Sequence, residues 1–406
     1  MIVVRHVDCL LTMDPSHGEG PLGELRDAAV AIDRGRVVFV GADADAPVGA
    51  EEIDGRGTIG LPGLVDAHTH AVWLGSRHDE FVARLGGATY AEILERGGGI
   101  LSTVDAVRAG ADAALVAAAA GRLSESVDQG VVTLEIKGGY GLEAHHERRM
   151  LEAARSAGAA TGARVFTTFL GAHAIPREWR HDREGYVADV IENQLPRCAP
   201  VADFADAYVD RGAFTVDEGV RILTAAKAAG LGLRAHAEQI AHTGFAAAAA
   251  RLGALSVDHL ERIDDDGIAA VAEAGTVAML LPAAMLYLRD VAPPVAKLRE
   301  AGVPFAVATD RNPGSSPTSD LWACATLACL TMGLTVEEAL LGITTVAARS
   351  LGRPDLGRLR PGAAGDLVLV RPPWGERAGP GALVQPMGPK RVALVLREGA
   401  VLRRAP

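Results

Sequence analysis

The middle of the chain alternates between short apolar runs and longer alanine-rich stretches. Continuous apolar runs are typical of strands that are buried on both faces of a parallel sheet, and the stretches between them, such as 106–129 and 216–229, are predicted to be helices that cover it. Eight such strands favour a closed (β/α)₈ barrel. An open, doubly wound sheet is the alternative, which would normally show a glycine-rich phosphate turn early in the chain. The eight strand candidates are Gly63–His70, Val131–Lys137, Arg164–Leu170, Phe204–Val209, Leu231–His236, Ser256–Leu260, Thr276–Leu281 and Pro304–Asp310.

Both ends of the chain change to a β-rich pattern with turns. Neither end is large enough for a core of its own, so we predict that the two join into one small β-sandwich domain. The predicted domains are this small β domain, 1–60 with 358–406, and the catalytic barrel, 61–357. The strand candidates of the small domain are Ile2–Leu11, Ala28–Ile32, Val37–Val40, Asp366–Val370, Arg391–Arg397 and Ala400–Leu402.

Composition excludes several classes of partner. The 406 residues are 49% hydrophobic and carry a net charge of -11, which argues against nucleic acid and means that an anionic substrate needs a local cation. We see no signal peptide and no apolar run long enough to span a membrane, so we expect a cytoplasmic protein without membrane partners. None of the four cysteines forms a CxxC pair, which favours free, mostly buried thiols in a reducing compartment.

Polar side chains gather at the C-terminal ends of the predicted strands, the face on which barrels of this kind carry their functional residues. His68 and His70 are two residues apart, so on a strand they point to the same side. With His236 and Asp310 at later strand ends, they form the predicted ligand set. Three imidazoles and one carboxylate suit Zn²⁺ or Fe²⁺ with a position left for water. The fourth predicted strand carries no lysine that could bridge a second metal ion. Lys137 could in principle do so, but it lies on the second strand, so we expect one metal ion.

Six segments carry a resemblance that extends over the whole barrel. The His-x-His on the first strand, the histidines on the fifth and sixth and the aspartate on the eighth resemble the amidohydrolase superfamily, and the segments resemble, more narrowly, the imidazolonepropionase family. They are HTHAVWLGSR (68–77), EIKGGYGL (135–142), TTFLGAHAIP (167–176), RAHAEQ (234–239), VDHLE (257–261) and ATDRNPGSSP (308–317).

The resemblance implies a reaction of histidine catabolism. Metal-activated water hydrolyses the cyclic amide C–N bond of 4-imidazolone-5-propanoate, a small-molecule substrate, and gives N-formimidoyl-L-glutamate. It also implies one divalent metal per subunit, Zn²⁺ or iron as Fe²⁺/Fe³⁺, and a homodimer. His259 and Asp310 are the implied catalytic residues. The implied substrate-binding residues are Arg77, which suits the propionate carboxylate, together with Tyr140, His173, Gln239, Asn312, Gly314 and Ser315.

Three positions depart from the family pattern, and one of them is Gly138, which is commonly Ser in the family. Some family members have Glu where this chain has Gln239, and because an amide cannot act as a base, we expect His259 or Asp310 to take the water proton. Arg311 replaces a residue that is usually uncharged, and we expect it to face solvent.

Two other functions are considered. A different cyclic amidase or a deaminase of the same superfamily would use the same metal, but Arg77, Tyr140 and the 312–315 loop suit a ring that bears a carboxylate. A non-enzymatic barrel that has lost its metal should lack ligands, whereas this chain has the full set.

Overall fold

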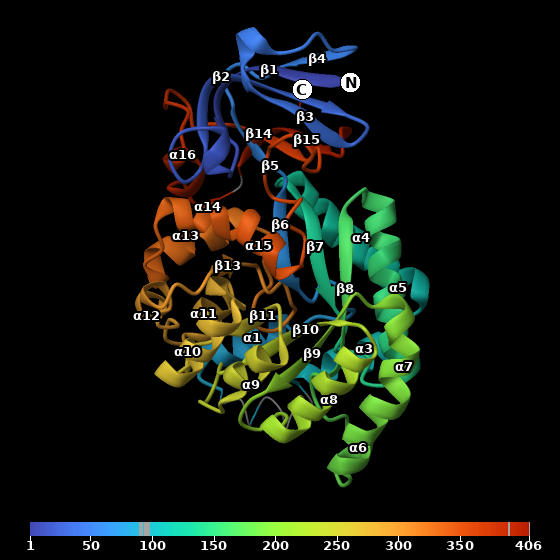
Figure 1. Ribbon diagram of the computed structural model, residues 1–406. Helices are drawn as coiled ribbons and strands as arrows, with labels where there is room; N and C mark the ends of the chain where they lie inside the picture. Colours follow the sequence, from blue (N-terminus) through green and yellow to red (C-terminus); the bar gives the residue numbers. More distant parts are fainter. Residues whose placement is uncertain (89–91, 93–97, 389, 406) are drawn as a thin grey trace.

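The computed structural model describes residues 1–88, 92, 98–388 and 390–405. It consists of a barrel with helices around it and a sheet that carries both termini, drawn above the barrel (Figure 1). All eight predicted barrel strands are confirmed, and consecutive strands pair in parallel. They are β6 (Leu64–Thr69), β7 (Val131–Lys137), β8 (Arg164–Ala172), β9 (Phe204–Val209), β10 (Gly232–Ala237), β11 (Ser256–His259), β12 (Val277–Leu280) and β13 (Phe305–Val307).

The first strand and the segment after the last strand meet, which closes the sheet. The Asp310 amide donates to the carbonyl of His68 at 3.0 Å, and the His70 amide donates to the carbonyl of Arg311 at 2.9 Å. A parallel bridge joins Thr69 to Arg311 between them. The closed barrel is therefore confirmed over the open, doubly wound sheet, and the closure brings the end of β6 beside Asp310.

Helices alternate with the barrel strands and cover the outside of the barrel (Figure 1). The stretch 106–129, predicted as one helix, is two, because Gly110 has an extended ψ of 149° that breaks the helical path between α3 and α4. The α-helices are α1 (His78–Leu85), α3 (Ile100–Ala109), α4 (Asp112–Asp128), α5 (Ala144–Thr161), α6 (Arg183–Asp189), α7 (Leu195–Cys198), α8 (Val216–Ala228), α9 (Phe245–Leu252), α10 (Asp265–Ala274), α11 (Pro282–Leu288), α12 (Val295–Glu300), α13 (Leu321–Met332), α14 (Val336–Gly342), α15 (Thr345–Ser350) and α16 (Gly381–Val384).

Both termini contribute to the second sheet, as predicted. Its central strand β1 pairs with β2 along its length and with the parallel strands β4 and β5 at its two ends, and β5 pairs with β14 from the other terminus. One apolar cluster takes Val4, Val30, Leu369 and Leu394 from both terminal segments, so the folded sheet encloses a core of its own. The strands are β1 (Ile2–Leu11), β2 (Glu24–Asp33), β3 (Arg36–Ala42), β4 (Glu51–Asp54), β5 (Ile59–Pro62), β14 (Leu367–Arg371), β15 (Arg391–Arg397) and β16 (Ala400–Arg404).

The direction of β6 decides where the site lies. β5 belongs to the terminal sheet and ends at Pro62, and β6 begins at Leu64 and runs away from that sheet (Figure 1). Because all barrel strands are parallel, their carboxyl ends lie together at the end of the barrel remote from the terminal sheet.

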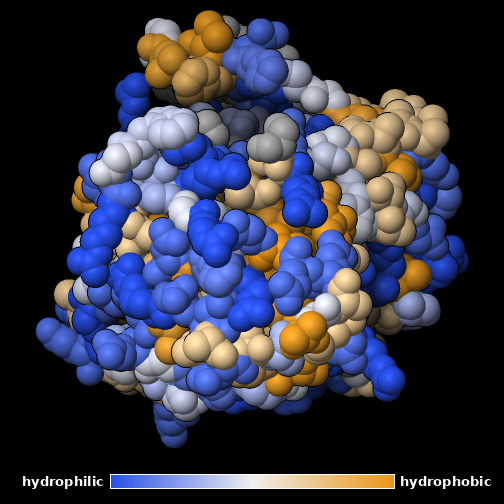
Figure 2. Space-filling view, turned by 90° about the horizontal axis from the view of Figure 1, so that it is seen from above, coloured by the Kyte–Doolittle hydropathy of each residue, from blue (hydrophilic) through white to orange (hydrophobic). Residues whose placement is uncertain are grey.

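The face of the molecule seen from above is mostly hydrophilic, with hydrophobic side chains gathered in a few patches (Figure 2). Among the described helices, none has the length and hydropathy that a membrane crossing requires. The four cysteines are free and three of them are buried, as expected from their spacing.

Candidate metal centre and active site

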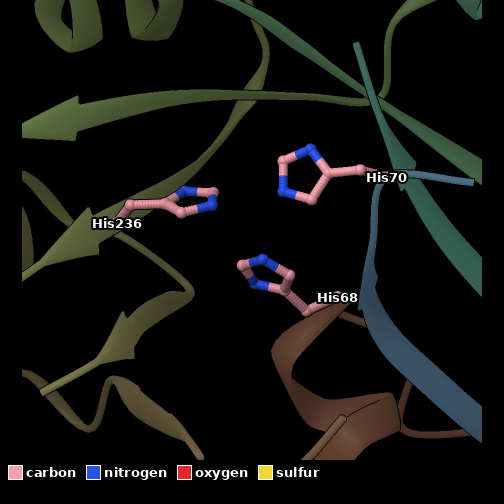
Figure 3. A group of neighbouring side chains, drawn as sticks. All are labelled: His68, His70 and His236. Carbon is pink, nitrogen blue, oxygen red and sulfur yellow. The ribbon is translucent and has the colours of Figure 1, made fainter. Parts of the chain in front are cut away.

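Three imidazoles meet at the carboxyl end of the barrel. His68 lies on β6, His70 follows that strand directly, and His236 lies on β10. Their rings face a common space (Figure 3), with ring centroids 4.6 Å apart for His68 and His236 and 5.5 Å apart for His68 and His70. All three side chains are buried, and burial lowers the pKa of His68 and His70 well below the ordinary value. Neutral imidazole is the form that binds metal ions, so the rings of His68 and His70 are in the binding state at neutral pH.

Two buried carboxylates orient two of these rings. Nδ1 of His68 lies 2.7 Å from Oδ2 of Asp258, and Nδ1 of His236 lies 3.0 Å from Oδ2 of Asp206. A carboxylate accepts a hydrogen bond from Nδ1–H, which keeps the proton on Nδ1 and leaves the lone pair of Nε2 free on the opposite side of the ring. Carboxylate–histidine pairs of this kind fix the orientation of metal-binding histidines. Sequence reasoning gave neither aspartate a role.

Asp310 completes the predicted ligand set. Its Oδ1 lies 3.4 Å from Nε2 of His68 and 3.6 Å from Nε2 of His70, and burial raises its pKa to about 6. The buried Nε2 of His68 has no hydrogen-bond partner in the part of the chain that the structure describes. Because an unpaired buried polar atom is costly, a cation is the natural partner for it. Three imidazoles and a carboxylate therefore fit a divalent metal of the zinc or iron type.

His259 lies beside this group at the end of β11. Its ring centroid is 5.5 Å from that of His236, and its Nδ1 lies 3.9 Å from Oε1 of Glu261. Burial lowers the pKa of His259, but Glu261 and Asp310 outweigh burial and leave it above the ordinary value. His259 and Asp310 also have positive φ angles, +83° and +51°, which are uncommon for residues other than glycine and concentrate at functional sites.

A fully buried charged layer lies beneath the imidazoles. Lys137, at the end of β7, contacts Asp206 on β9, and Arg234 lies 3.7 Å from Glu135 and 3.8 Å from Asp258. Burial lowers the pKa of Lys137, but Asp206 and Glu135 outweigh burial and leave it above the ordinary value. Sequence reasoning gave Lys137 only a weak role as a metal ligand and missed the rest of the layer.

Aromatic side chains extend the site on one side of the metal ligands. The ring of His173 stacks on His70 with centroids 5.0 Å apart, and Tyr140 lies 5.8 Å from His70 and 5.5 Å from His173. Nδ1 of His173 donates to the carbonyl of Gly139 at 2.9 Å, and burial lowers its pKa to about 3, so the ring is neutral with its Nε2 as an acceptor.

The loop that carries Tyr140 is built around a buried carboxylate. Glu147 accepts hydrogen bonds from the amides of Gly139, Gly141 and Leu142. A Cβ at Gly138 would lie 2.2 Å from Oε2 of Glu147, and Gly139 has a φ of +93° that favours glycine. Glu147 therefore explains both glycines and holds Tyr140 in place, although nothing in the sequence pattern singled it out.

Arg77 and Gly314 are neighbours, although they are far apart in the chain. The Arg77 side chain is held by Glu80, whose Oε2 lies 2.9 Å from Nε and 2.8 Å from Nη2. A Cβ placed on Gly314 would lie 2.2 Å from Nη1 of Arg77, so the glycine makes room for the guanidinium. The structure thus brings two predicted substrate-binding residues together, and Glu80 is a partner that sequence reasoning missed.

We expect Gly314→Ala to raise KM by about tenfold and to leave kcat nearly unchanged, because the added methyl group displaces Arg77 without touching the imidazoles. Steady-state kinetics measures both constants. Gly121→Ala is the matched control, since a Cβ there meets nothing within 4 Å. A Gly314→Ala enzyme with unchanged KM would contradict this packing.

The loop after strand β13 is held by Asn312. Its Nδ2 donates to the carbonyl of Asp310 at 2.7 Å, and its Oδ1 accepts from the amides of Gly314 and Ser315 at 2.9 and 2.8 Å. These bonds fix Gly314 and Ser315 next to Asp310. Direct contacts of Asn312 and Ser315 with substrate stay predictions.

Gln239 lies at the edge of the histidine group, where its Oε1 accepts a hydrogen bond of 3.1 Å from Tyr208. The expectation that Arg311 faces solvent is wrong. Its side chain is buried, donates to the carbonyl of Arg122 at 2.6 Å and pairs with Glu125, because the segment that closes the barrel directs it toward α4.

Comparison with known proteins identifies the family of the chain. A model of the amidohydrolase family matches residues 59–399. The imidazolonepropionase of Cupriavidus pinatubonensis is 46% identical over 384 residues, which cover 93% of this chain and 90% of that protein. The chain belongs to the imidazolonepropionase family of amidohydrolases. The imidazolonepropionase of Cupriavidus taiwanensis is similar too, at 45% identity over 406 residues that cover 98% of this chain and 95% of that protein.

Solved structures of other amidohydrolases share the fold. An adenosine deaminase from Xanthomonas campestris with bound zinc has a TM-score of 0.75 over 98% of this chain and 92% of that chain. At 18% identity this likeness supports the barrel and the terminal sheet alone. The resemblance stated from the six sequence segments is confirmed by the family membership.

Proposed function

We propose that this chain is an imidazolonepropionase, a metal-dependent hydrolase that opens the ring of 4-imidazolone-5-propanoate to N-formimidoyl-L-glutamate. The relatives that it matches over nearly their whole length carry that name. The observation that carries the proposal is the joint presence of two features at one barrel end: three converging imidazoles with Asp310, and Arg77 against the Gly314 loop.

The metal ligands are His68, His70, His236 and Asp310. A divalent metal bound there supplies a water of lowered pKa and polarises the ring carbonyl. We propose one such ion per subunit, zinc or iron. Asp206 and Asp258 keep the Nε2 lone pairs of His236 and His68 directed at the ion.

Asp310 and His259 handle the proton of the attacking water. Both are buried, both lie next to the imidazoles, and the pKa of Asp310 is raised to about 6 by burial, which suits proton uptake near neutral pH. Gln239 orients substrate or water through its amide but takes no proton. His259 can then pass the proton to the ring nitrogen as the C–N bond breaks.

The substrate is held at its two ends. The guanidinium of Arg77 binds the propionate carboxylate, and the overall charge of -11 makes this local cation necessary. At the other end the neutral His173 offers Nε2 to an N–H of the ring, and the Tyr140 hydroxyl donates to the substrate. Asn312, Gly314 and Ser315 complete the pocket through the loop that Asn312 holds.

We also propose that the enzyme works as a homodimer in the cytoplasm. Size-exclusion chromatography with light scattering measures the subunit number. A monomer at working concentration would contradict the dimer.

A substrate assay combined with elemental analysis of the same sample tests the function. We expect purified protein to remove the ultraviolet absorbance of imidazolone propionate and to contain about one zinc or iron per chain. A panel of purines, pyrimidines and hydantoins tests the alternative, a deaminase or another cyclic amidase. Faster turnover of any of these than of imidazolone propionate would reject the proposal.

A further inference from the structure

A buried cation lies between three carboxylates under the imidazoles. Nζ of Lys137 lies 2.8 Å from Oδ2 of Asp206, 3.0 Å from Oε1 of Glu135 and 3.6 Å from Oδ2 of Asp258. The four side chains are fully buried and come from the strands β7, β9 and β11. Burying an ammonium is costly unless it is paired, and here it is paired with carboxylates from three strands.

Two of these carboxylates are the ones that orient metal ligands. Asp206 accepts from Nδ1 of His236 and Asp258 accepts from Nδ1 of His68. The ammonium of Lys137 therefore faces the same oxygen atoms that orient the imidazoles, Oδ2 of Asp206 and Oδ2 of Asp258, and it joins the two carboxylates into one unit.

The same carboxylates form a second group with the geometry of a cation site. One ligand atom each from Asp206, His236 and Asp258 lie within 4.8 Å of one another, and this group shares His236 with the three-histidine group. The ammonium of Lys137 already lies within ion-pair distance of both of its carboxylates. Together with Glu135 the layer has three carboxylates and two cations, Lys137 and Arg234.

We propose that Lys137 is a positioning residue whose ammonium takes the place of a second metal ion, bridges Asp206 and Asp258, and thereby limits the centre to one divalent ion. The proposal rests on the proposed function only in taking the three-histidine group as the place where that ion binds. In this proposal Lys137 holds the two carboxylates in place with its charge. It does not bind a metal ion, which is the role that its position at a strand end suggests.

Metal counting in Lys137→Ala tests this proposal. The substitution leaves three carboxylates with Arg234 as their one cation, so two negative charges are unbalanced and one divalent ion would balance them. The carboxylate oxygens that lose the ammonium suit Mn²⁺. After dialysis against excess Zn²⁺ and Mn²⁺, elemental analysis should show a rise from about one metal per chain in the wild type to about two in the variant. The double variant Lys137→Ala/Asp206→Asn removes one carboxylate as well and should return to one.

Lys297→Ala is the matched control. Lys297 also pairs with an aspartate, Asp265, at 2.7 Å, but on the exposed surface. Its metal count should equal that of the wild type. A folded Lys137→Ala protein that holds a single metal after this dialysis would overturn the proposal.

Thermal unfolding covers the case in which Lys137→Ala is unstable without metal. Excess Mn²⁺ should then raise the melting temperature of Lys137→Ala more than that of Lys137→Ala/Asp206→Asn. The single variant keeps all three carboxylates, whereas the double variant has lost one of them. Equal shifts would reject the lysine proposal. A wild-type protein that binds no metal would reject the proposed function instead, so the two failures are distinguishable.

Discussion

Replacing His70 by alanine should remove the bound metal and the turnover together. His70 supplies one of three imidazoles that face a common space. Loss of the activated water should lower kcat/KM at least about a thousandfold, or about 4 kcal/mol of transition-state stabilisation. Kinetics and elemental analysis on the same sample measure both effects.

Thermal unfolding separates loss of the metal from loss of the fold. Zinc should raise the melting temperature of the wild type and have little effect on His70→Ala, because only a ligand that binds the native state stabilises it. His145→Ala is the matched control, since His145 is exposed on α5 and should retain metal, turnover and the zinc-dependent shift. A His70→Ala enzyme with full metal content and wild-type turnover would show that the three-histidine group is not the catalytic centre.

The barrel and the convergence of the candidate metal ligands could be predicted because local pattern and topology agree on them. Continuous apolar runs predicted all eight barrel strands, and a parallel barrel places the ends of all strands on one face. His68, His236 and Asp310 therefore had to be neighbours once the fold was right. The division of the chain into 1–60 with 358–406 and 61–357 stays a prediction.

The charged layer under the ligands could not be predicted in the same way. Asp206, Glu135 and Lys137 lie on strands, and which side chains meet inside a barrel depends on a register that the sequence pattern does not contain. One signal was available, since buried β7 carries two charged residues in an otherwise apolar run, and buried charges need partners. Arg311 shows the opposite error: its charge suggested solvent, whereas the closing segment buries it against α4.

The substrate-binding residues stay predictions, and the contacts that hold them in the structure were not predicted. Arg77 was expected, and its partner Glu80 lies three residues later, a spacing at which side chains on a helix interact. Tyr140 was expected, whereas Glu147, which holds its loop, is visible only when three backbone amides converge on it. Residues that hold a loop are not part of a repeating pattern of polar and apolar positions, so the pattern does not reveal them.

Replacing Arg77 by methionine should raise KM about 100- to 1,000-fold, because two hydrogen bonds to a charged carboxylate are worth about 3–4 kcal/mol together. The guanidinium lies against the Gly314 loop and does not contact the imidazoles, so kcat should fall much less than kcat/KM. Metal content should stay at the wild-type value, which separates this variant from His70→Ala. Arg56→Met is the matched control, because Arg56 is exposed on the terminal sheet side and pairs with Asp54.

A substrate analogue identifies the group that Arg77 recognises. The primary amide of the propionate side chain keeps the ring and its scissile bond but lacks the negative charge. Wild-type enzyme should prefer the acid over the amide by about the same 100- to 1,000-fold factor, and Arg77→Met should lose most of that preference, because the lost interaction is the one that distinguishes the two. An Arg77→Met enzyme that still prefers the acid to the wild-type extent would place the carboxylate elsewhere in the barrel mouth, with Arg77 serving only to hold α1 through Glu80.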